Sequence, residues 1–113
     1  MNVEEHLDID ALQDLKEIME NEFETLVNTF VMDSQSKLQE LDGVVADNDA
    51  ESIRKLAHSL KGSSSNVCAF KLSEYARQLE AMGKDEKTDG ALNVLQELKQ
   101  EFEIITQILN DNL

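Results

Sequence analysis

Apolar residues recur every three or four positions in long stretches of this chain, the spacing that places them on one face of an α-helix. The members of one such stripe, which include a serine, are Phe23, Leu26, Val27, Phe30, Ser34, Leu38 and Leu41. The last stripe contains Leu92, Leu95, Leu98, Phe102, Ile105, Ile108 and Leu109. Each stripe predicts a helix that buries one side against its neighbours.

The composition also favours helices. The chain of 113 residues has no proline and four glycines, and 4% of its residues are aromatic. A β-sandwich or barrel would need more turn residues and more aromatic or β-branched strands. We therefore predict an all-α fold, an antiparallel up-down-up-down four-helix bundle with an additional short N-terminal helix. One domain is expected over residues 1–113, with residues 1–9 as a flexible arm.

Residues that favour helix ends predict where the helices begin and stop. N-terminal caps, each followed three residues later by Glu or Gln, are expected at Asp10, Asn21 and Asn48. Glycine is expected to end the second helix at Gly43 and the fourth at Gly83. The helix that follows Asn48 is expected to reach about Ser65 or Asn66.

Charge and hydropathy exclude several classes of partner. The formal net charge of −14 opposes binding to nucleic acid or to an anionic membrane surface. No apolar run approaches the roughly twenty residues of a membrane-spanning helix, and the N-terminus does not resemble a signal peptide. The single cysteine, Cys68, suits a reducing compartment. These features predict a cytoplasmic protein, and a closed bundle without a long apolar seam predicts a monomer.

Patterns for metal and nucleotide binding are missing from the sequence. It contains no Glu-x-x-His pair, no Cys/His cluster of zinc spacing and no glycine-rich phosphate loop. We therefore expect no metal site and no cofactor. His6, in the N-terminal arm, is expected to be a mobile, solvated residue.

The other histidine, His58, is placed to face a partner. The apolar side of its helix carries Ile53, Leu56, Ala57 and Leu60. At about 100° per residue, the His58 side chain points away from that side. The residues that share its side are Arg54, Lys61, Gly62 and Ser65. The imidazole is therefore expected to face solvent.

Gly62 follows His58 by one helical turn, and glycine in a helix interior costs about 1 kcal/mol relative to alanine. The missing side chain would clear the approach of a partner surface to the imidazole. The alternative is that the helix ends at Gly62 and that the serines after it form a loop. Spacing alone slightly favours this alternative.

The charge pattern around His58 favours a functional site. No acidic residue occurs between Glu51 and Glu74, although the chain contains 24 of them. The basic residues of the same window are Arg54, Lys55, Lys61 and Lys71. Such a window suits a group that carries extra negative charge, such as a phosphoryl group. It is also compatible with a solvated basic face.

These residues resemble the signature of a known family. The run from His58 to Ser64, followed by Ala69, Leu72 and the Leu79-Glu80 pair, is similar to that of histidine-containing phosphotransfer (HPt) domains, and the likeness covers nearly the whole chain. It matches the short, stand-alone bacterial form. One departure is Cys68, at a position where the family usually has glycine, so the turn there is expected to differ.

The resemblance implies a function as a phosphorelay intermediate in two-component signalling. His58 would accept a phosphoryl group from an aspartyl phosphate of one receiver domain and pass it to an aspartate of another, with Lys61 steadying the phosphoryl oxygens. Arg54, Lys55, Gly62 and Ser65 would form the docking surface. The partners would be receiver domains of response regulators and hybrid histidine kinases, and the magnesium ion would belong to the receiver. The chain would have no kinase or phosphatase activity of its own.

Two other functions compete with this one. The chain could be a binding or inhibitory helical bundle in which His58 is incidental, but that hypothesis leaves the cost of Gly62 unexplained. It could also be a His-dependent phosphatase in a kinase-like bundle. Such bundles typically have Glu or Asp after the histidine, so Ser59 disfavours that hypothesis.

Overall fold

The computed structural model describes residues 2–113, so Met1 of the expected arm lies outside the described residues. A 3₁₀ helix, η1 (Val3–Glu5), precedes five α-helices. They are α1 (Ile9–Met19), α2 (Glu22–Ala46), α3 (Ala50–Asn66), α4 (Phe70–Lys84) and α5 (Ala91–Asp111). Residues 2–113 contain no strand. The predicted fold class is confirmed, whereas the single domain over residues 1–113 stays a prediction.

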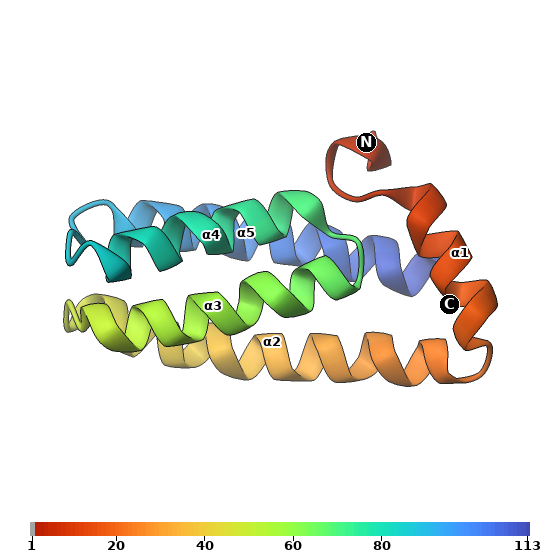
Figure 1. Ribbon diagram of the computed structural model, residues 1–113, viewed down its shortest axis with the longest axis horizontal. Helices are drawn as coiled ribbons and strands as arrows, with labels where there is room; N and C mark the ends of the chain where they lie inside the picture. The colour runs from red at the N-terminus through yellow and green to blue at the C-terminus, as the bar shows by residue number, and fades with distance from the viewer. Residues whose placement is uncertain (1) are drawn as a thin grey trace.

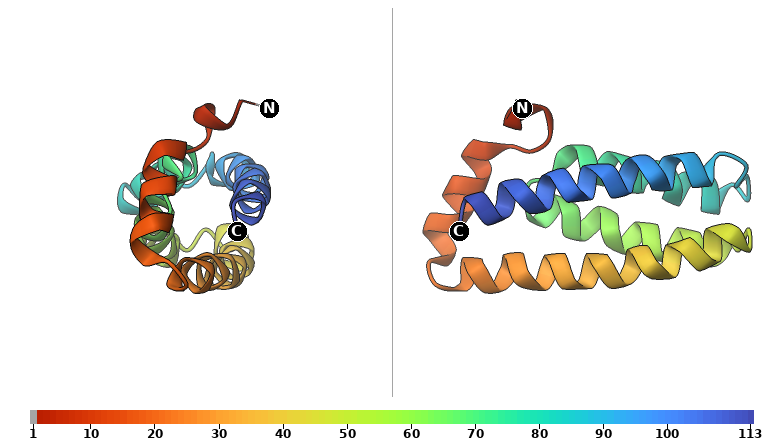
Figure 2. Two further views of the ribbon diagram at one scale, coloured as in Figure 1. Left: turned by 90° about the vertical axis from the view of Figure 1, so that its right-hand side faces the viewer. Right: turned by 180° about the vertical axis from the view of Figure 1, so that it is seen from behind.

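Helices α2 to α5 form an antiparallel bundle, and α1 crosses one end of it (Figure 1). Neighbouring contacts run from α2 to α3, α4, α5 and back to α2, with α3 and α4 in the closest association. The α3–α4 pair therefore forms one long side of the bundle, and the α2–α5 pair forms the opposite side (Figure 2). None of the described helices combines the length and hydrophobicity that a membrane crossing requires.

The apolar stripes pack into one core, as their spacing predicts. Phe23, Val27, Phe30, Leu38 and Leu41 of α2 are all buried. The exception is Leu92, in the first turn of α5, which is 56% exposed. It lies seven residues before Lys99, so both residues belong to the outer side of that helix.

For two of the three helices with a predicted N-terminal cap, a different residue nearby is the cap. The third predicted cap residue makes no side-chain cap bond. Asp8 rather than Asp10 caps α1, because its Oδ1 accepts a hydrogen bond from the Ala11 amide at 3.0 Å. Asp49 caps α3, whereas Asn48 adopts a left-handed backbone with φ 53°. Asn21 makes no side-chain cap bond, because its backbone is already helical rather than extended.

The two glycines expected at helix ends lie inside helices instead. Helix α2 continues through Gly43 to Ala46 and buries Val45, and α4 continues through Gly83 to Lys84. Gly83 is required by packing: a Cβ at this position would lie 2.6 Å from the Ala50 carbonyl oxygen. Left-handed backbone occurs at non-glycine residues that follow helices, namely Glu20, Asn48, Cys68 and Glu86.

Cys68 has φ 64°, the conformation that glycine adopts without strain. The turn expected to differ at this residue therefore keeps a conformation that glycine favours. Its carbonyl oxygen accepts a hydrogen bond from the Asp8 amide at 3.0 Å. The turn thus also anchors the N-terminal segment.

The N-terminal segment packs on the bundle through His6 and Leu7, which are 7% and 0% exposed. The expectation that His6 is mobile and solvated is wrong. Its Nδ1 lies 2.8 Å from Oε2 of Glu101, a carboxylate of α5 that is 3% exposed. Burial of Leu7 places the neighbouring imidazole where it can pair with this carboxylate.

Candidate functional site

His58 lies in the middle of α3 on the outer side of the helix, and its side chain is 66% exposed. Ala57 and Leu60 of the same helix are buried in the core. The imidazole therefore faces solvent, as its position relative to the apolar stripe predicts.

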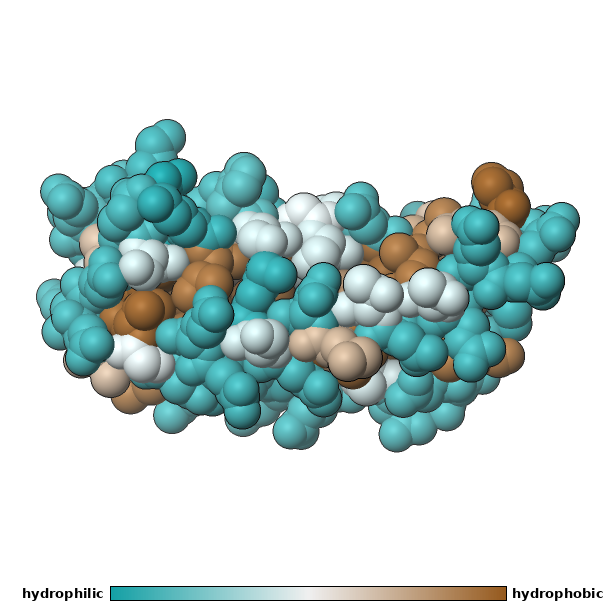
Figure 3. Space-filling view, turned by 90° about the horizontal axis from the view of Figure 1, so that it is seen from below, coloured by the Kyte–Doolittle hydropathy of each residue, from teal (hydrophilic) through white to brown (hydrophobic). Residues whose placement is uncertain are grey.

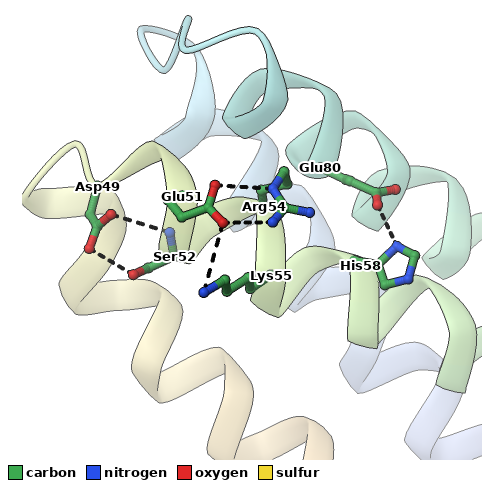
Figure 4. A network of polar contacts seen from close by, with 7 residues as sticks. All are labelled: Asp49, Glu51, Ser52, Arg54, Lys55, His58 and Glu80. Atoms are coloured by element: carbon green, nitrogen blue, oxygen red, sulfur yellow. Dashed lines mark hydrogen bonds and ion pairs between the residues drawn. The ribbon is translucent and has the colours of Figure 1, made fainter.

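Glu80 of α4 connects the two residues that the sequence places at the centre of the site. Its Oε2 lies 2.5 Å from Nδ1 of His58 (Figure 4), and its Oε1 accepts a hydrogen bond from Nζ of Lys61 at 2.6 Å. The Glu80 side chain is 18% exposed, less than either partner. No acidic residue lies near His58 in the sequence of α3, but in the folded chain α4 places the carboxylate of Glu80 next to it.

The contact with Glu80 determines which imidazole nitrogen is free to react. An ionised carboxylate can only accept a hydrogen bond, so Nδ1 of His58 must be the donor. In the neutral imidazole the lone pair then lies on Nε2, which makes no hydrogen bond within residues 2–113. The site thus presents one nucleophilic nitrogen in a fixed orientation.

The hydrogen bond from Lys61 is the main cause that lowers the pKa of Glu80; partial burial opposes it, and the bond from His58 adds to it. Glu80 therefore stays ionised at neutral pH. Because this pKa is lowered on folding, the stabilising contribution of Glu80 is present above the pKa of the unfolded chain. It is lost as the pH falls through the lower, folded value.

Gly62 lies inside α3, which continues for one more turn to Asn66. The alternative in which the helix ends at Gly62 is therefore wrong. A Cβ at this position would meet no other atom within 4 Å. The packing of this chain therefore does not require glycine at position 62, and the surface beside His58 is open there.

The other predicted docking residues are held by neighbours. Arg54 donates two hydrogen bonds to Glu51, at 2.6 and 3.2 Å, and Nζ of Lys55 lies 3.8 Å from the same carboxylate (Figure 4). Oγ of Ser65 donates to the Lys61 carbonyl oxygen at 3.1 Å. All of these residues belong to α3, so they lie within two turns of His58.

The site contains one residue to which the sequence analysis gave no role, Glu80. Its signal was the Leu79-Glu80 pair of the signature, but the spacing does not reveal that Glu80 faces His58 across two helices. Residues 2–113 contain no cluster of three His, Cys, Asp or Glu side chains that could hold a metal ion. The site therefore consists of an imidazole, a carboxylate and an ammonium group.

Comparisons with known proteins point to one family. The profile of the Hpt domain family matches residues 25–108. Histidine-containing phosphotransfer protein B (HptB) of Pseudomonas aeruginosa has a similar crystal structure, with a TM-score of 0.91 and 34% sequence identity over 95% of this chain and 93% of that chain. The comparison with curated proteins found no match.

Two plant proteins are more distant. The maize histidine-containing phosphotransfer protein ZmHP2 has a TM-score of 0.77 and 25% identity, over 86% of this chain and 81% of that chain. A rice protein described as a histidine-containing phosphotransfer protein has a TM-score of 0.80 and 21% identity, over 92% of this chain and 78% of that chain. At this identity the likeness supports the shared fold alone.

The fold and the site define a class of protein: a helical bundle that presents an exposed histidine on its surface. The chain belongs to the family of histidine-containing phosphotransfer (Hpt) domains. Membership of this family assigns the chain to phosphotransfer in two-component signalling, a process in which Hpt domains interact with receiver domains.

Proposed function

We propose that His58 is the residue that carries the phosphoryl group, and that the chain relays this group between receiver domains of response regulators and hybrid histidine kinases. The observation that supports this proposal best is the contact of Glu80 with Nδ1, which leaves Nε2 of an exposed imidazole free. The chain acts as a monomer in the cytoplasm, without kinase or phosphatase activity of its own.

In the forward step, the Nε2 lone pair attacks the phosphorus of an aspartyl phosphate on the receiver. The N–P bond forms as the P–O bond to the aspartate breaks, and the aspartate leaves as a carboxylate. The reverse step returns the phosphoryl group to the aspartate of a second receiver. Phosphoryl transfer depends mainly on positioning and on charge stabilisation. Glu80 positions the imidazole, and the receiver supplies the magnesium ion.

Lys61 is the residue of this chain that stabilises the phosphoryl oxygens. Its ammonium group lies one turn from His58 and is paired with Glu80 before transfer. An ammonium group forms several hydrogen bonds at once and pivots on a flexible stem. Lys61 can therefore turn toward the phosphoryl group when it arrives, while Glu80 keeps its bond to Nδ1.

The receiver docks on the outer side of α3, over Gly62 and beside Arg54, Lys55 and Ser65. Viewed from the α2 side, the surface is mostly hydrophilic, with a hydrophobic hollow toward the end where α2 leads into α3 (Figure 3). A pocket between these helices is lined by Glu40, Val44, Ser52, Lys55 and Leu56. Lys55 belongs to the docking surface and also lines this hollow. The hollow therefore extends the docking surface with an apolar area.

The decisive experiment is incubation with a phosphorylated receiver, followed by mass spectrometry at neutral or alkaline pH, at which phosphohistidine survives. We expect one acid-labile phosphoryl group on His58 and complete loss of labelling in His58→Gln. Circular dichroism should show that His58→Gln keeps the wild-type fold, because the side chain is exposed. Labelling that persists in His58→Gln would overturn the proposal. The absence of labelling from competent receivers would instead favour a binding or inhibitory bundle.

Gly62→Gln tests the clearance beside His58. We expect a folded protein with slower phosphoryl transfer, because the new side chain would project from the docking surface into open space. Replacing glycine inside α3 should also raise the free energy of unfolding by up to about 1 kcal/mol. Stopped-flow transfer rates and urea unfolding measure the two effects. An unchanged transfer rate would show that the receiver does not approach over Gly62.

A further inference from the structure

The two long sides of the bundle differ strongly in charge. Helices α3 and α4 together contain six Lys and Arg residues and three Asp and Glu residues. Helices α2 and α5 contain two lysines and nine Asp and Glu residues. The side that carries His58 is therefore basic, and the opposite side is acidic, although the chain as a whole has a net charge of −14. Partners of different charge are expected on the two sides.

The acidic side contains a groove of about 650 Å³ between α2 and α5. Leu38 and Phe102 form its apolar floor and are each 7% exposed, and the exposed Met32 stands at its rim with 69% of its surface accessible. Phe102 packs against Phe30 with ring centroids 6.1 Å apart, which supports the floor from the core. The polar lining consists of Gln35, Ser36, Gln39, Asp42, Lys99 and Glu103.

The charges of this groove favour a cationic occupant. Lys99 forms an ion pair with Asp42, so its charge is already compensated. Glu103, in contrast, has no cationic partner within the part of the chain that the structure describes. A second copy that docked through the same side would bring its own Glu103 and the other exposed carboxylates of α2 and α5 toward these, which opposes a symmetric dimer. An amphipathic helix with an apolar face and basic flanks is complementary to both the floor and the rim.

We propose that the α2–α5 groove is a second docking site, and that it binds a basic amphipathic helix of a partner protein. The bundle itself separates this groove from His58, because His58 belongs to α3 and the groove is lined by α2 and α5, the helix pair on the other side of the bundle (Figure 2). A partner bound in the groove leaves the approach to His58 open. The chain can then be held by one protein while it exchanges phosphoryl groups with another. This site goes beyond the relay function and does not depend on it.

The probe is a model peptide of about 18 residues, five helical turns, with leucines at three- and four-residue spacing and lysines elsewhere. It is titrated into the ¹⁵N-labelled full chain at physiological salt. We expect saturable binding, with the largest amide shifts at Met32, Gln39 and Glu103 and small shifts at Gly62. A peptide with glutamate in place of lysine should not bind. Absence of saturable binding, or largest shifts on α1 or α3, would overturn the proposal.

A pair of matched variants separates the groove from the overall charge. Met32→Lys combined with Glu103→Lys should weaken peptide binding by at least about tenfold, because an apolar anchor is lost and the rim charge is inverted. Ile18→Lys combined with Glu17→Lys makes the same changes on α1, where Ile18 is 79% exposed, and should change Kd by less than about twofold. Equal weakening by both pairs would mean that net charge alone attracts the peptide.

A third readout comes from the phosphoryl-labelling assay. Peptide-saturated protein should be labelled on His58 at the same rate as free protein, because the two sites lie on opposite sides. A loss of labelling on peptide addition would place the peptide on the α3–α4 side and overturn the groove. Concentration-dependent self-association that Met32→Lys abolishes would assign the groove to a second copy and would equally overturn the proposal.

Discussion

Replacing Gly83 with alanine is expected to lower the free energy of unfolding by about 2 kcal/mol, even though alanine is the better helix former. The new Cβ would lie 2.6 Å from the Ala50 carbonyl oxygen and 2.7 Å from the Arg54 amide nitrogen. Both atoms belong to the backbone of α3, so no side chain can move to make room. The end of α4 must therefore shift away from the beginning of α3.

Urea unfolding measures this loss, and Gly62→Ala is the matched control. Both glycines lie inside helices, but a Cβ at Gly62 would meet no atom within 4 Å. Gly62→Ala should therefore stabilise the protein by up to about 1 kcal/mol. If Gly83→Ala were also stabilising, the close packing of α3 on α4 would be wrong.

The same substitution should slow phosphoryl transfer, because Glu80 lies one turn before Gly83 on α4. A shift of α4 would move the Glu80 carboxylate away from Nδ1 of His58. The two groups are 2.5 Å apart in the wild-type structure. The ¹⁵N chemical shifts of the His58 imidazole would report the loss of this bond. Gly83 thus connects the packing of the bundle to the geometry of the site.

This connection explains which part of the site the sequence could predict. The exposure of His58 follows from the spacing of Ile53, Ala57 and Leu60, which a single helix determines. The contact with Glu80 depends on how α3 and α4 align, and that alignment is set by the close approach at Gly83. In the sequence Gly83 resembles a helix end, because glycine is favoured both at the ends of helices and where two backbones approach closely.

The helix boundaries show a similar limit. The stripes predict the helices, but neighbouring residues compete for the cap positions, as Asp8 does with Asp10 and Asp49 with Asn48. The residue that adopts the extended backbone becomes the cap, and tertiary packing decides which one does. In α1 the burial of Leu7 and the bond between the Asp8 amide and Cys68 hold Asp8 in place.

The role of His6 could have been suspected from α5. Glu101 lies at helical spacing between Leu98 and Ile105, so it belongs to the buried stripe of that helix. A carboxylate on a buried face needs a partner, because an unpaired buried charge is strongly unfavourable. The sequence therefore contained the acceptor of this contact, but it did not indicate that an N-terminal histidine reaches it.

His6→Ala is accordingly expected to destabilise the protein by about 3 kcal/mol, because it leaves a buried carboxylate without its closest hydrogen-bond partner. Among residues 2–113, the cationic group left near the Glu101 carboxylate, which is 3% exposed, would be Nζ of Lys71 at 3.9 Å. We expect both a weaker attachment of the N-terminal segment to the bundle and a lower free energy of global unfolding. Urea unfolding and hydrogen exchange at the Leu7 amide measure the two.

The control is the double variant His6→Ala with Glu101→Met, in which no charge is left buried. Replacing a buried pair by apolar residues of similar volume is often neutral or stabilising. The double variant should therefore recover most of the stability that His6→Ala loses. If His6→Ala alone changed the free energy of unfolding by less than about 0.5 kcal/mol, as surface substitutions do, the imidazole would not be paired in the core. If the double variant were no more stable than His6→Ala, the loss would come from the missing imidazole contacts rather than from the stranded carboxylate.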